Sequence, residues 1–163
     1  MNYSFTCSKL DNAKIILKKY KPEIKKIIDI MLALPELRTS KVFNKKISKI
    51  RFDISFCNDD TIHQINKDYR NKDSATDVIT FSLFADDENA LIHRKTADLG
   101  QIIISVETAQ KQAKESIEKE ILTLITHGIA HLFGFDHLTK KDYDFVVGIQ
   151  EKVIKNYEKI SLK

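Results

Sequence analysis

The chain of 163 residues carries 27 lysines and arginines against 23 aspartates and glutamates, and 42% of it is hydrophobic. This balance predicts one folded domain over residues 1–163 and excludes an intrinsically disordered chain, while four glycines and two prolines exclude a collagen-like or linker-dominated one. No apolar stretch approaches the roughly 20 residues that span a bilayer, and the first residues lack a signal-peptide layout. We therefore expect a cytoplasmic protein without a membrane segment.

Four segments have the pattern of β-strands. Apolar and polar residues alternate over 3–7 and 49–56, which predicts two strands with one buried face each. The segment 78–83 places apolar residues on one face, and the apolar run 102–104 predicts a strand covered on both sides. Together these segments predict a sheet of about four strands.

Apolar residues at helical spacing predict five helices. The last two have the clearest boundaries, because Gly134 can end one in a left-handed turn and Thr139 with Asp142 resembles a capping box that begins the next. The first helix is expected to begin near Pro22 and to end before Pro35, and the second to be capped by Asp59 or Asp60. The third is expected over 106–114, and the fourth, which Gly134 ends, to begin at Ser116.

The order of these elements predicts the α+β class: a mixed sheet of about four strands packed with five or so helices. The long segment 85–98 is expected to be a solvated connection. Cys7 and Cys57 have no redox or metal spacing, so we expect two reduced core thiols rather than a disulfide. Lysines concentrate in 14–26 and 41–49, a charge that suits RNA but is also common on solvated helix faces.

Three of the five histidines fall within one window of the chain: His127, His131 and His137. His127 and His131 are four residues apart on a predicted helix, so their imidazoles project from the same face. The turn expected at Gly134 can bring His137 back as a third ligand. Unrelated surface histidines are the simpler interpretation of any single one, but His-x-x-x-His-x-x-Gly-x-x-His as a whole indicates a metal site.

Three imidazoles without thiolates suit a single zinc ion. With three protein ligands the fourth position stays open for water, as in catalytic zinc sites, and the metal brings the pKa of that water towards neutrality. His63 and His93 have no such partners and are expected to be surface or capping histidines. The pattern therefore predicts metal-dependent hydrolysis.

The histidine spacing is also that of the zinc-binding helix of metzincin proteases. Those proteases place a glutamate directly after the first histidine as general base, and here that residue is Gly128. Losing a general base costs roughly 10²–10⁴-fold in rate. A zinc metalloprotease is therefore the less favoured alternative.

Three sequence blocks resemble the YbeY-type endoribonucleases, a bacterial family linked to ribosomal RNA maturation. The window 127–137 is similar to the family signature His-Gly-x-Leu-His-Leu-x-Gly-Tyr-Asp-His, with Ala130 and Phe135 as its two departures. Residues 65–82 resemble a second block containing Tyr-Arg and Thr-Asp-Val. Residues 99–105 resemble a third block, in which Gln101 stands where the family usually has aspartate.

This resemblance implies a single-strand-specific, metal-dependent endoribonuclease that acts in ribosomal RNA maturation and ribosome quality control. It implies RNA as substrate, and the small ribosomal subunit and its assembly factors as partners. Arg70 is the expected catalytic residue, because a guanidinium is permanently charged and matches phosphate oxygens in a bidentate fork. The alternative for Arg70 is a surface arginine in a salt bridge, and Lys72 is expected to be a solvated loop lysine.

The sequence leaves some alternatives for the mechanism and the function open. The nucleophile can be water or the RNA 2′-hydroxyl, and Asp136 can accept a hydrogen bond from a ligand histidine or cap the turn after Gly134. A non-catalytic ribosome-assembly or RNA-binding module is the second functional alternative. In that case the zinc would be structural and Cys57 could close its fourth position.

Overall fold

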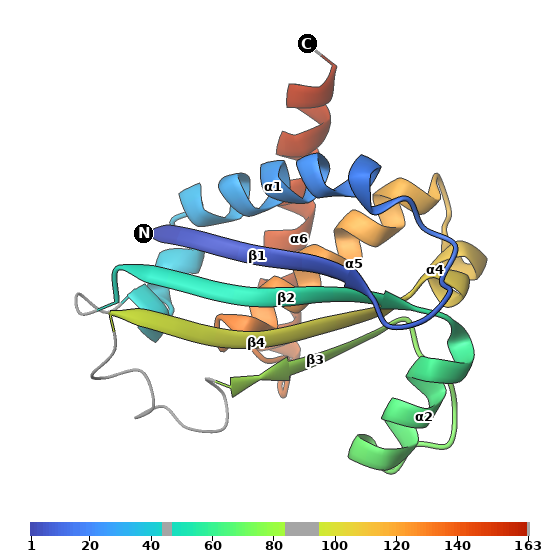
Figure 1. The fold of residues 1–163 in the computed structure, drawn as a ribbon. Coiled ribbons are helices and arrows are strands. Elements are labelled where there is room, and N and C mark those ends of the chain that lie inside the picture. The colour runs from blue at the N-terminus through green and yellow to red at the C-terminus, as the bar shows by residue number, and fades with distance from the viewer. Residues whose placement is uncertain (44–46, 84–94, 163) are drawn as a thin grey trace.

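The computed structural model describes residues 1–43, 47–83 and 95–162, and its centre is a four-stranded mixed sheet (Figure 1). The strands are β1 (Asn2–Lys9), β2 (Lys49–Cys57), β3 (Val78–Ser82) and β4 (Thr96–Ser105), in the spatial order β1-β2-β4-β3. β2 pairs in parallel with both β1 and β4, whereas β3 runs antiparallel to β4. The predicted α+β class with a mixed sheet is confirmed.

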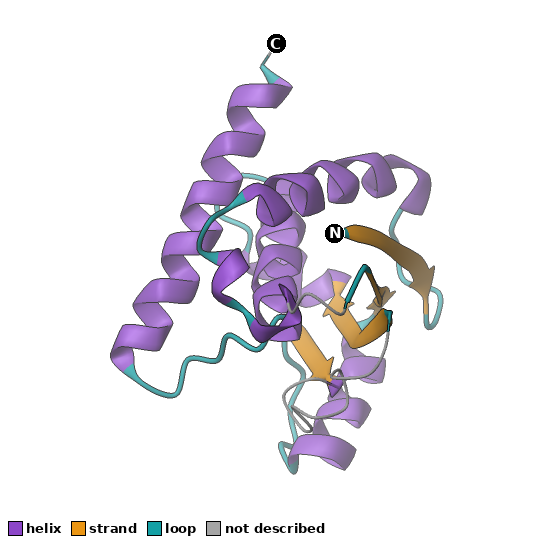
Figure 2. Cartoon of the chain, turned by 90° about the vertical axis from the view of Figure 1, so that its left-hand side faces the viewer, coloured by secondary structure: helices purple, strands orange, loops and turns teal. Residues whose placement is uncertain are grey.

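Five α-helices surround this sheet in the described part of the chain. Figure 2 shows α1, α5 and α6 together on one side of the strands, with α2 apart from them. The helices are α1 (Leu17–Ala33), α2 (Asp59–Arg70), α4 (Val106–Gln112), α5 (Ile117–Leu132) and α6 (Lys140–Ser161). No helix of the described residues is long and apolar enough to cross a lipid bilayer.

The sheet buries side chains on both faces. The larger core lies between the inner face and α1, α5 and α6, and contains Ile102 of β4. A smaller cluster on the outer face joins Cys57 and Ile103 to Ile62 of α2 and Ile79 of β3. The prediction that 102–104 form a strand covered on both sides is confirmed, because neighbouring residues of a strand point to opposite faces.

The two cysteines are free thiols, as predicted. Cys57 is fully buried, whereas Cys7 on edge strand β1 is only half-buried. Burial raises the pKa of the Cys57 thiol to about 12, so this cysteine is protonated at neutral pH. It behaves as a small apolar residue of the outer cluster.

Three predicted boundaries are wrong. α1 begins at Leu17, so Pro22 lies inside it, and packing of the buried residues 20–31 outweighs the hydrogen bond that proline cannot donate. α2 is capped by Asn58, whose side chain accepts from the Thr61 N–H, and not by Asp59 or Asp60. β4 begins at Thr96, so the end of the expected connection 85–98 is strand, and 84–94 lie outside the described residues.

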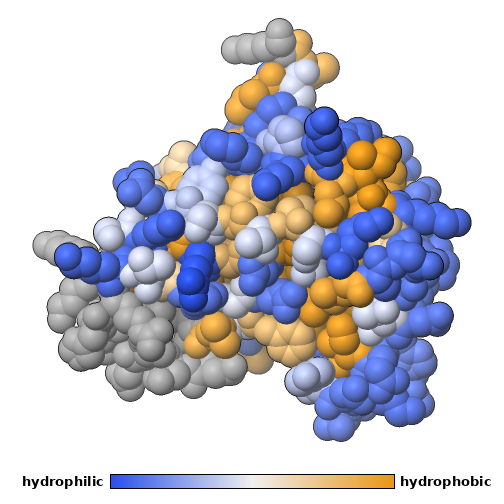
Figure 3. All heavy atoms as spheres, in the orientation of Figure 1, coloured by the Kyte–Doolittle hydropathy of each residue, from blue (hydrophilic) through white to orange (hydrophobic). Residues whose placement is uncertain are grey.

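α2 is fixed to the rest of the fold by the Asp59 carboxylate. It accepts hydrogen bonds from Ser105 Oγ and Thr108 Oγ1, both at 2.6 Å, and an ion pair from Lys111 Nζ, also at 2.6 Å. Figure 3 shows hydrophilic side chains over the outer surface of α2, at the lower right. The Asp59 cluster and the buried Ile62 are therefore what attach this polar helix to β4 and α4.

These contacts make the stability of the protein depend on pH in the acid range, where Asp59 becomes protonated. Partial burial acts to raise the pKa of Asp59, but the hydrogen bonds from Lys111, Ser105 and Thr108 outweigh it and lower the pKa to about 2. Because the pKa is lower in the folded state, ionised Asp59 contributes its full stabilisation at pH values above about 4, the pKa of an aspartate in the unfolded chain. This contribution is lost as the pH falls towards 2. It amounts to at most about 2 kcal/mol.

We expect Asp59→Asn to lower the free energy of unfolding at pH 7. Urea unfolding of both proteins between pH 7 and pH 2 measures the difference, which should shrink as the pH falls from about 4 to 2. Other carboxylates titrate in both proteins and cancel in this comparison. A difference that stays constant over the whole range would contradict the role assigned to Asp59.

Candidate functional site

His127 and His131 lie on α5, which packs closely against β4. Gly128 of the same helix faces Ile102 of β4, and a Cβ added to this glycine would lie 2.7–2.9 Å from side-chain carbons of Ile102. Such contacts are shorter than side chains tolerate, so a glycine is required for this approach of helix and strand. His127 and His131 project from the adjoining face of α5, towards the cleft.

The segment after α5 turns back as predicted. Gly134 has a φ of 83°, in the left-handed region, and its N–H donates to the His131 carbonyl. Phe133 anchors the turn, because its ring is buried against Phe43 and its carbonyl accepts a hydrogen bond from Ser40 Oγ at 2.5 Å. This turn returns His137 towards the helix.

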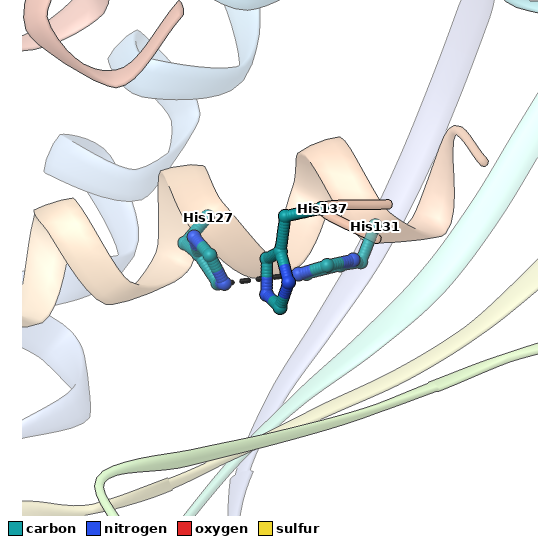
Figure 4. Close-up of side chains that lie close together, drawn as sticks. All are labelled: His127, His131 and His137. Carbon is teal, nitrogen blue, oxygen red and sulfur yellow. Dashed lines mark hydrogen bonds between the residues drawn. The ribbon is translucent and has the colours of Figure 1, made fainter. Parts of the chain in front are cut away.

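The three imidazoles meet at one point (Figure 4). The Nε2 atoms of His127 and His131 are 2.9 Å apart, and the ring of His137 lies 5.5 Å and 4.9 Å from the two other rings. One ring nitrogen from each histidine falls within 4.8 Å of the others. Because zinc binds imidazole nitrogens at about 2.0–2.1 Å, this set fits a single ion.

The histidine environment also favours a metal over protons. Burial lowers the pKa of His127, and burial together with the neighbouring histidines lowers the pKa of His131 to about 4. Both rings are therefore neutral at pH 7 and hold a lone pair that a metal can share. The three-histidine site thus has the donor set that suits a zinc ion, and two of its members, His127 and His131, are already neutral.

Neighbouring groups orient the ligand histidines. Gln150 of α6 places its Oε1 atom 3.4 Å from Nδ1 of His127, where it can accept the ring N–H and leave Nε2 facing the cluster. Asp136 accepts the backbone N–H of His137 at 2.7 Å. Of the two roles open for Asp136, capping of the turn is the one that its hydrogen bond supports.

The histidines lie in an open cleft of about 770 Å³ along edge strand β3. Arg70, at the C-terminal end of α2, lines the same cleft, and its Nη2 donates to the Thr80 carbonyl at 3.3 Å. Within the described residues Arg70 forms no ion pair with a carboxylate, so the surface salt bridge considered as its alternative role is absent. The structure thus brings together four residues that the sequence separates by up to 67 positions.

Other candidate residues lie elsewhere. Gln101 is on the outer face of the sheet, where its amide donates to Ser55 Oγ at 2.9 Å, so it does not replace an acidic group beside the histidines. Cys57 belongs to the outer cluster and cannot close a fourth position at the metal. His63 pairs with Asp73 away from the cleft, and His93 lies outside the described residues.

The lysine-rich segment 14–26 does not line the cleft. Its helical part belongs to α1, which Figure 1 shows on the β1 side of the sheet, opposite β3. Three of its lysines form ion pairs within the chain: Lys19 with Glu118, Lys25 with Asp29, and Lys26 with Glu23. Part of the second lysine run, 44–46, lies outside the described residues.

Comparison with known proteins identifies the family of this chain. A family model described as "Endoribonuclease YbeY" matches residues 7–158. The chain belongs to this family. A relative from Staphylococcus carnosus with the same name is 40% identical over 71% of this chain and 80% of its own, and one from Malacoplasma penetrans is 36% identical over 89% of both.

A solved structure has the same fold. The solution structure of protein TM1509 from Thermotoga maritima covers 96% of this chain and 93% of its own, with a TM-score of 0.55 and 21% identity. All three histidines and Arg70 lie within the region that the family model matches. The resemblance stated from three sequence blocks is therefore confirmed at the level of the family.

Sequence reasoning missed several cleft residues. Gln150 lies on α6, 23 residues after His127, Tyr143 lies on the same helix, and Tyr69 lies on α2. Nothing in the spacing of these residues marks them, because their position depends on how α2 and α6 pack. Only the adjacency of Tyr69 to Arg70 gave a signal, within the second sequence block.

The close packing at Gly128 leads to a test with a matched control. We expect Gly128→Ala to lower the free energy of unfolding by about 1–3 kcal/mol, because the new Cβ overlaps Ile102. At Gly148 on α6 an added Cβ meets nothing within 4 Å, so Gly148→Ala should stabilise by about 0.5–1 kcal/mol through helix propensity. Denaturant unfolding measures both, and stabilisation by both substitutions would contradict the packing argument.

Proposed function

We propose that this protein is a zinc-dependent endoribonuclease that cleaves single-stranded RNA, with ribosomal RNA as its substrate. The observation that carries the proposal is the convergence of His127, His131 and His137 in a cleft that also contains Arg70. Membership of the endoribonuclease family supports RNA as the substrate class. The family resemblance supports the small ribosomal subunit and its assembly factors as partners, and the sequence-based expectation of a cytoplasmic protein is part of the proposal.

The residues of the cleft have different roles in the proposed reaction. The three histidines would hold zinc, oriented in part by Gln150, and the bound ion would supply Lewis-acid polarisation and an activated water at neutral pH. Arg70 would grip the non-bridging oxygens of the scissile phosphate and stabilise the negative charge that grows on them. Its bond to the Thr80 carbonyl holds the guanidinium at the cleft before substrate arrives.

The alternatives have weaker support. A metalloprotease needs a carboxylate at the position of Gly128, and that position faces Ile102 rather than the cleft. A structural zinc needs a fourth protein ligand, and Cys57 belongs to a different cluster. Three histidines in a cleft of this size would leave a fourth position of the ion for water, which suits a catalytic role.

Removal of one ligand tests the metal site. We expect zinc at about 100 times its dissociation constant to stabilise the unsubstituted protein by about 2.7 kcal/mol, and to have no such effect on His131→Ala. Cleavage of single-stranded ribosomal RNA should be lost in the same variant. His63→Ala is the matched control, because His63 is a partly exposed histidine outside the cleft, and it should keep both properties.

Thermal unfolding with and without zinc, and RNA cleavage on a gel, measure these effects for identically prepared proteins. Equal cleavage by His131→Ala and the unsubstituted protein would contradict the proposal, because the activity would then lie elsewhere. Zinc stabilisation without any RNA cleavage would instead favour the non-catalytic module.

Arg70 has a separate test. We expect Arg70→Ala to reduce kcat by roughly 10²–10³-fold, as for loss of other groups that stabilise transition-state charge, with zinc binding unchanged. Arg70→Lys should recover only part of the rate, since an ammonium cannot form the bidentate contact. Lys72→Ala is the control, because Lys72 is exposed and does not line the cleft. Equal losses at both positions would show a general effect of charge.

A further inference from the structure

The cleft carries little positive charge for a site that is to bind RNA. Among the described residues that line it, Arg70 is the one arginine or lysine, whereas Asp77, Glu120 and Asp136 are acidic. Apart from the proposed zinc ion, Arg70 is thus the one cationic group at this place, and the lysine-rich helix α1 lies at the other edge of the sheet. A single strand held here needs a second source of binding energy.

Tyr69 offers one such source. It lies next to Arg70 in the last turn of α2, lines the cleft, and is 71% exposed. The edge contact between its ring and that of Phe81, at 5.3 Å and 75°, holds it in place while its faces stay accessible. It is an ordered aromatic surface beside the proposed phosphate-binding residue.

Tyr143 lies beside the histidines on a different element. It belongs to the first turn of α6, whose start is fixed by the capping box of Thr139 and Asp142. Its ring centre is 6.2 Å from that of His137, and the residue is 54% exposed. Tyr143 therefore lines the cleft from the metal side, as Tyr69 does from the Arg70 side.

These two tyrosines differ from the other three in the chain. Tyr3 and Tyr157 donate their hydroxyls to Asp29 and Glu23, and Tyr20 is buried in the core. The hydroxyls of Tyr69 and Tyr143 make no hydrogen bond to any described residue. Packing and hydrogen bonding thus explain the other three tyrosines, but they do not explain two exposed aromatic rings in one cleft.

We propose that Tyr69 and Tyr143 bind the bases of single-stranded RNA by stacking, on either side of the phosphate held by Arg70 and the histidine site. The inference rests on the proposed endoribonuclease function and names the residues that would select an unpaired strand. Bases in a duplex are already stacked on one another, so only a single strand can offer its base faces to these rings. Stacking also supplies affinity without further cationic residues.

Binding to two strands of equal charge tests the stacking. A short labelled single-stranded RNA and an abasic strand of the same length are compared by fluorescence anisotropy, using His131→Ala as background so that the RNA stays intact. We expect Tyr69→Leu and Tyr143→Leu each to weaken binding of the base-bearing strand by about 5- to 100-fold. Binding of the abasic strand should stay the same, and Tyr→Phe at either position should bind like the background protein.

Steady-state cleavage by the zinc-loaded proteins gives the second readout. In the leucine variants KM should rise by a similar factor while kcat changes little, because stacking holds the strand in ground state and transition state alike. A fall in kcat with unchanged KM would overturn the proposal. So would equal losses of affinity for the two strands, or unchanged binding of the base-bearing strand.

The two proposals fail in different ways. Cleavage by the unsubstituted protein together with unaffected leucine variants would overturn stacking and leave the endoribonuclease in place. Tight, ring-dependent binding of the base-bearing strand without cleavage would support stacking and overturn the endoribonuclease. Absence of RNA binding by the unsubstituted protein would overturn both.

Discussion

The contact of α5 with β4 at Gly128 and Ile102 is the constraint on which the site depends. The absence of a side chain at Gly128 lets the helix approach the strand to within contact of the Ile102 side chain. This close approach fixes the rotation of the helix, so that His127 and His131 emerge on the side of edge strand β3. Any larger residue at Gly128 would force either the Ile102 side chain or the helix to shift.

Burial of α5 has a chemical consequence as well. The surroundings that pack the helix also desolvate His127 and His131, which lowers the pKa of each and keeps both imidazoles neutral. Neutral imidazoles repel a metal ion less and need not lose a proton to bind it. The packing that stabilises the fold thus prepares the ligands, and Gln150 adds an acceptor for the remaining ring N–H of His127.

The second half of the cleft depends on α2, which is attached separately. The Asp59 contacts with β4 and α4, and the burial of Ile62, hold this helix on the outer face of the sheet. Its C-terminal end then reaches the edge of β3, where Arg70 and Tyr69 face the histidines across the cleft. The site is therefore assembled at one sheet edge from helices on opposite faces of the sheet.

The sequence predicted the features that arise within one continuous segment. The spacing of His127 and His131, the left-handed turn at Gly134 and the capping box at Thr139 each depend on residues a few positions apart. Periodicity predicted the strands and helices one by one, and their order along the chain predicted the α+β class with a mixed sheet of about four strands. Only residues 102–104 of β4 were predicted as a strand. The earlier residues of β4 were missed because they do not form a continuous apolar run.

The tertiary structure decided what depends on contacts between distant segments. Pro22 lies inside α1 because core packing outweighs a local preference, and the partner of His127 is Gln150 because α6 packs beside α5. The sequence alone does not determine which of the two sheet faces a strand residue points to, so only the fold shows that Cys57 and Gln101 lie away from the histidines. The fold also brings Tyr69, Arg70 and Tyr143 into the same cleft as the histidines. Local patterns thus specified the candidate metal ligands, and long-range packing specified the cleft around them.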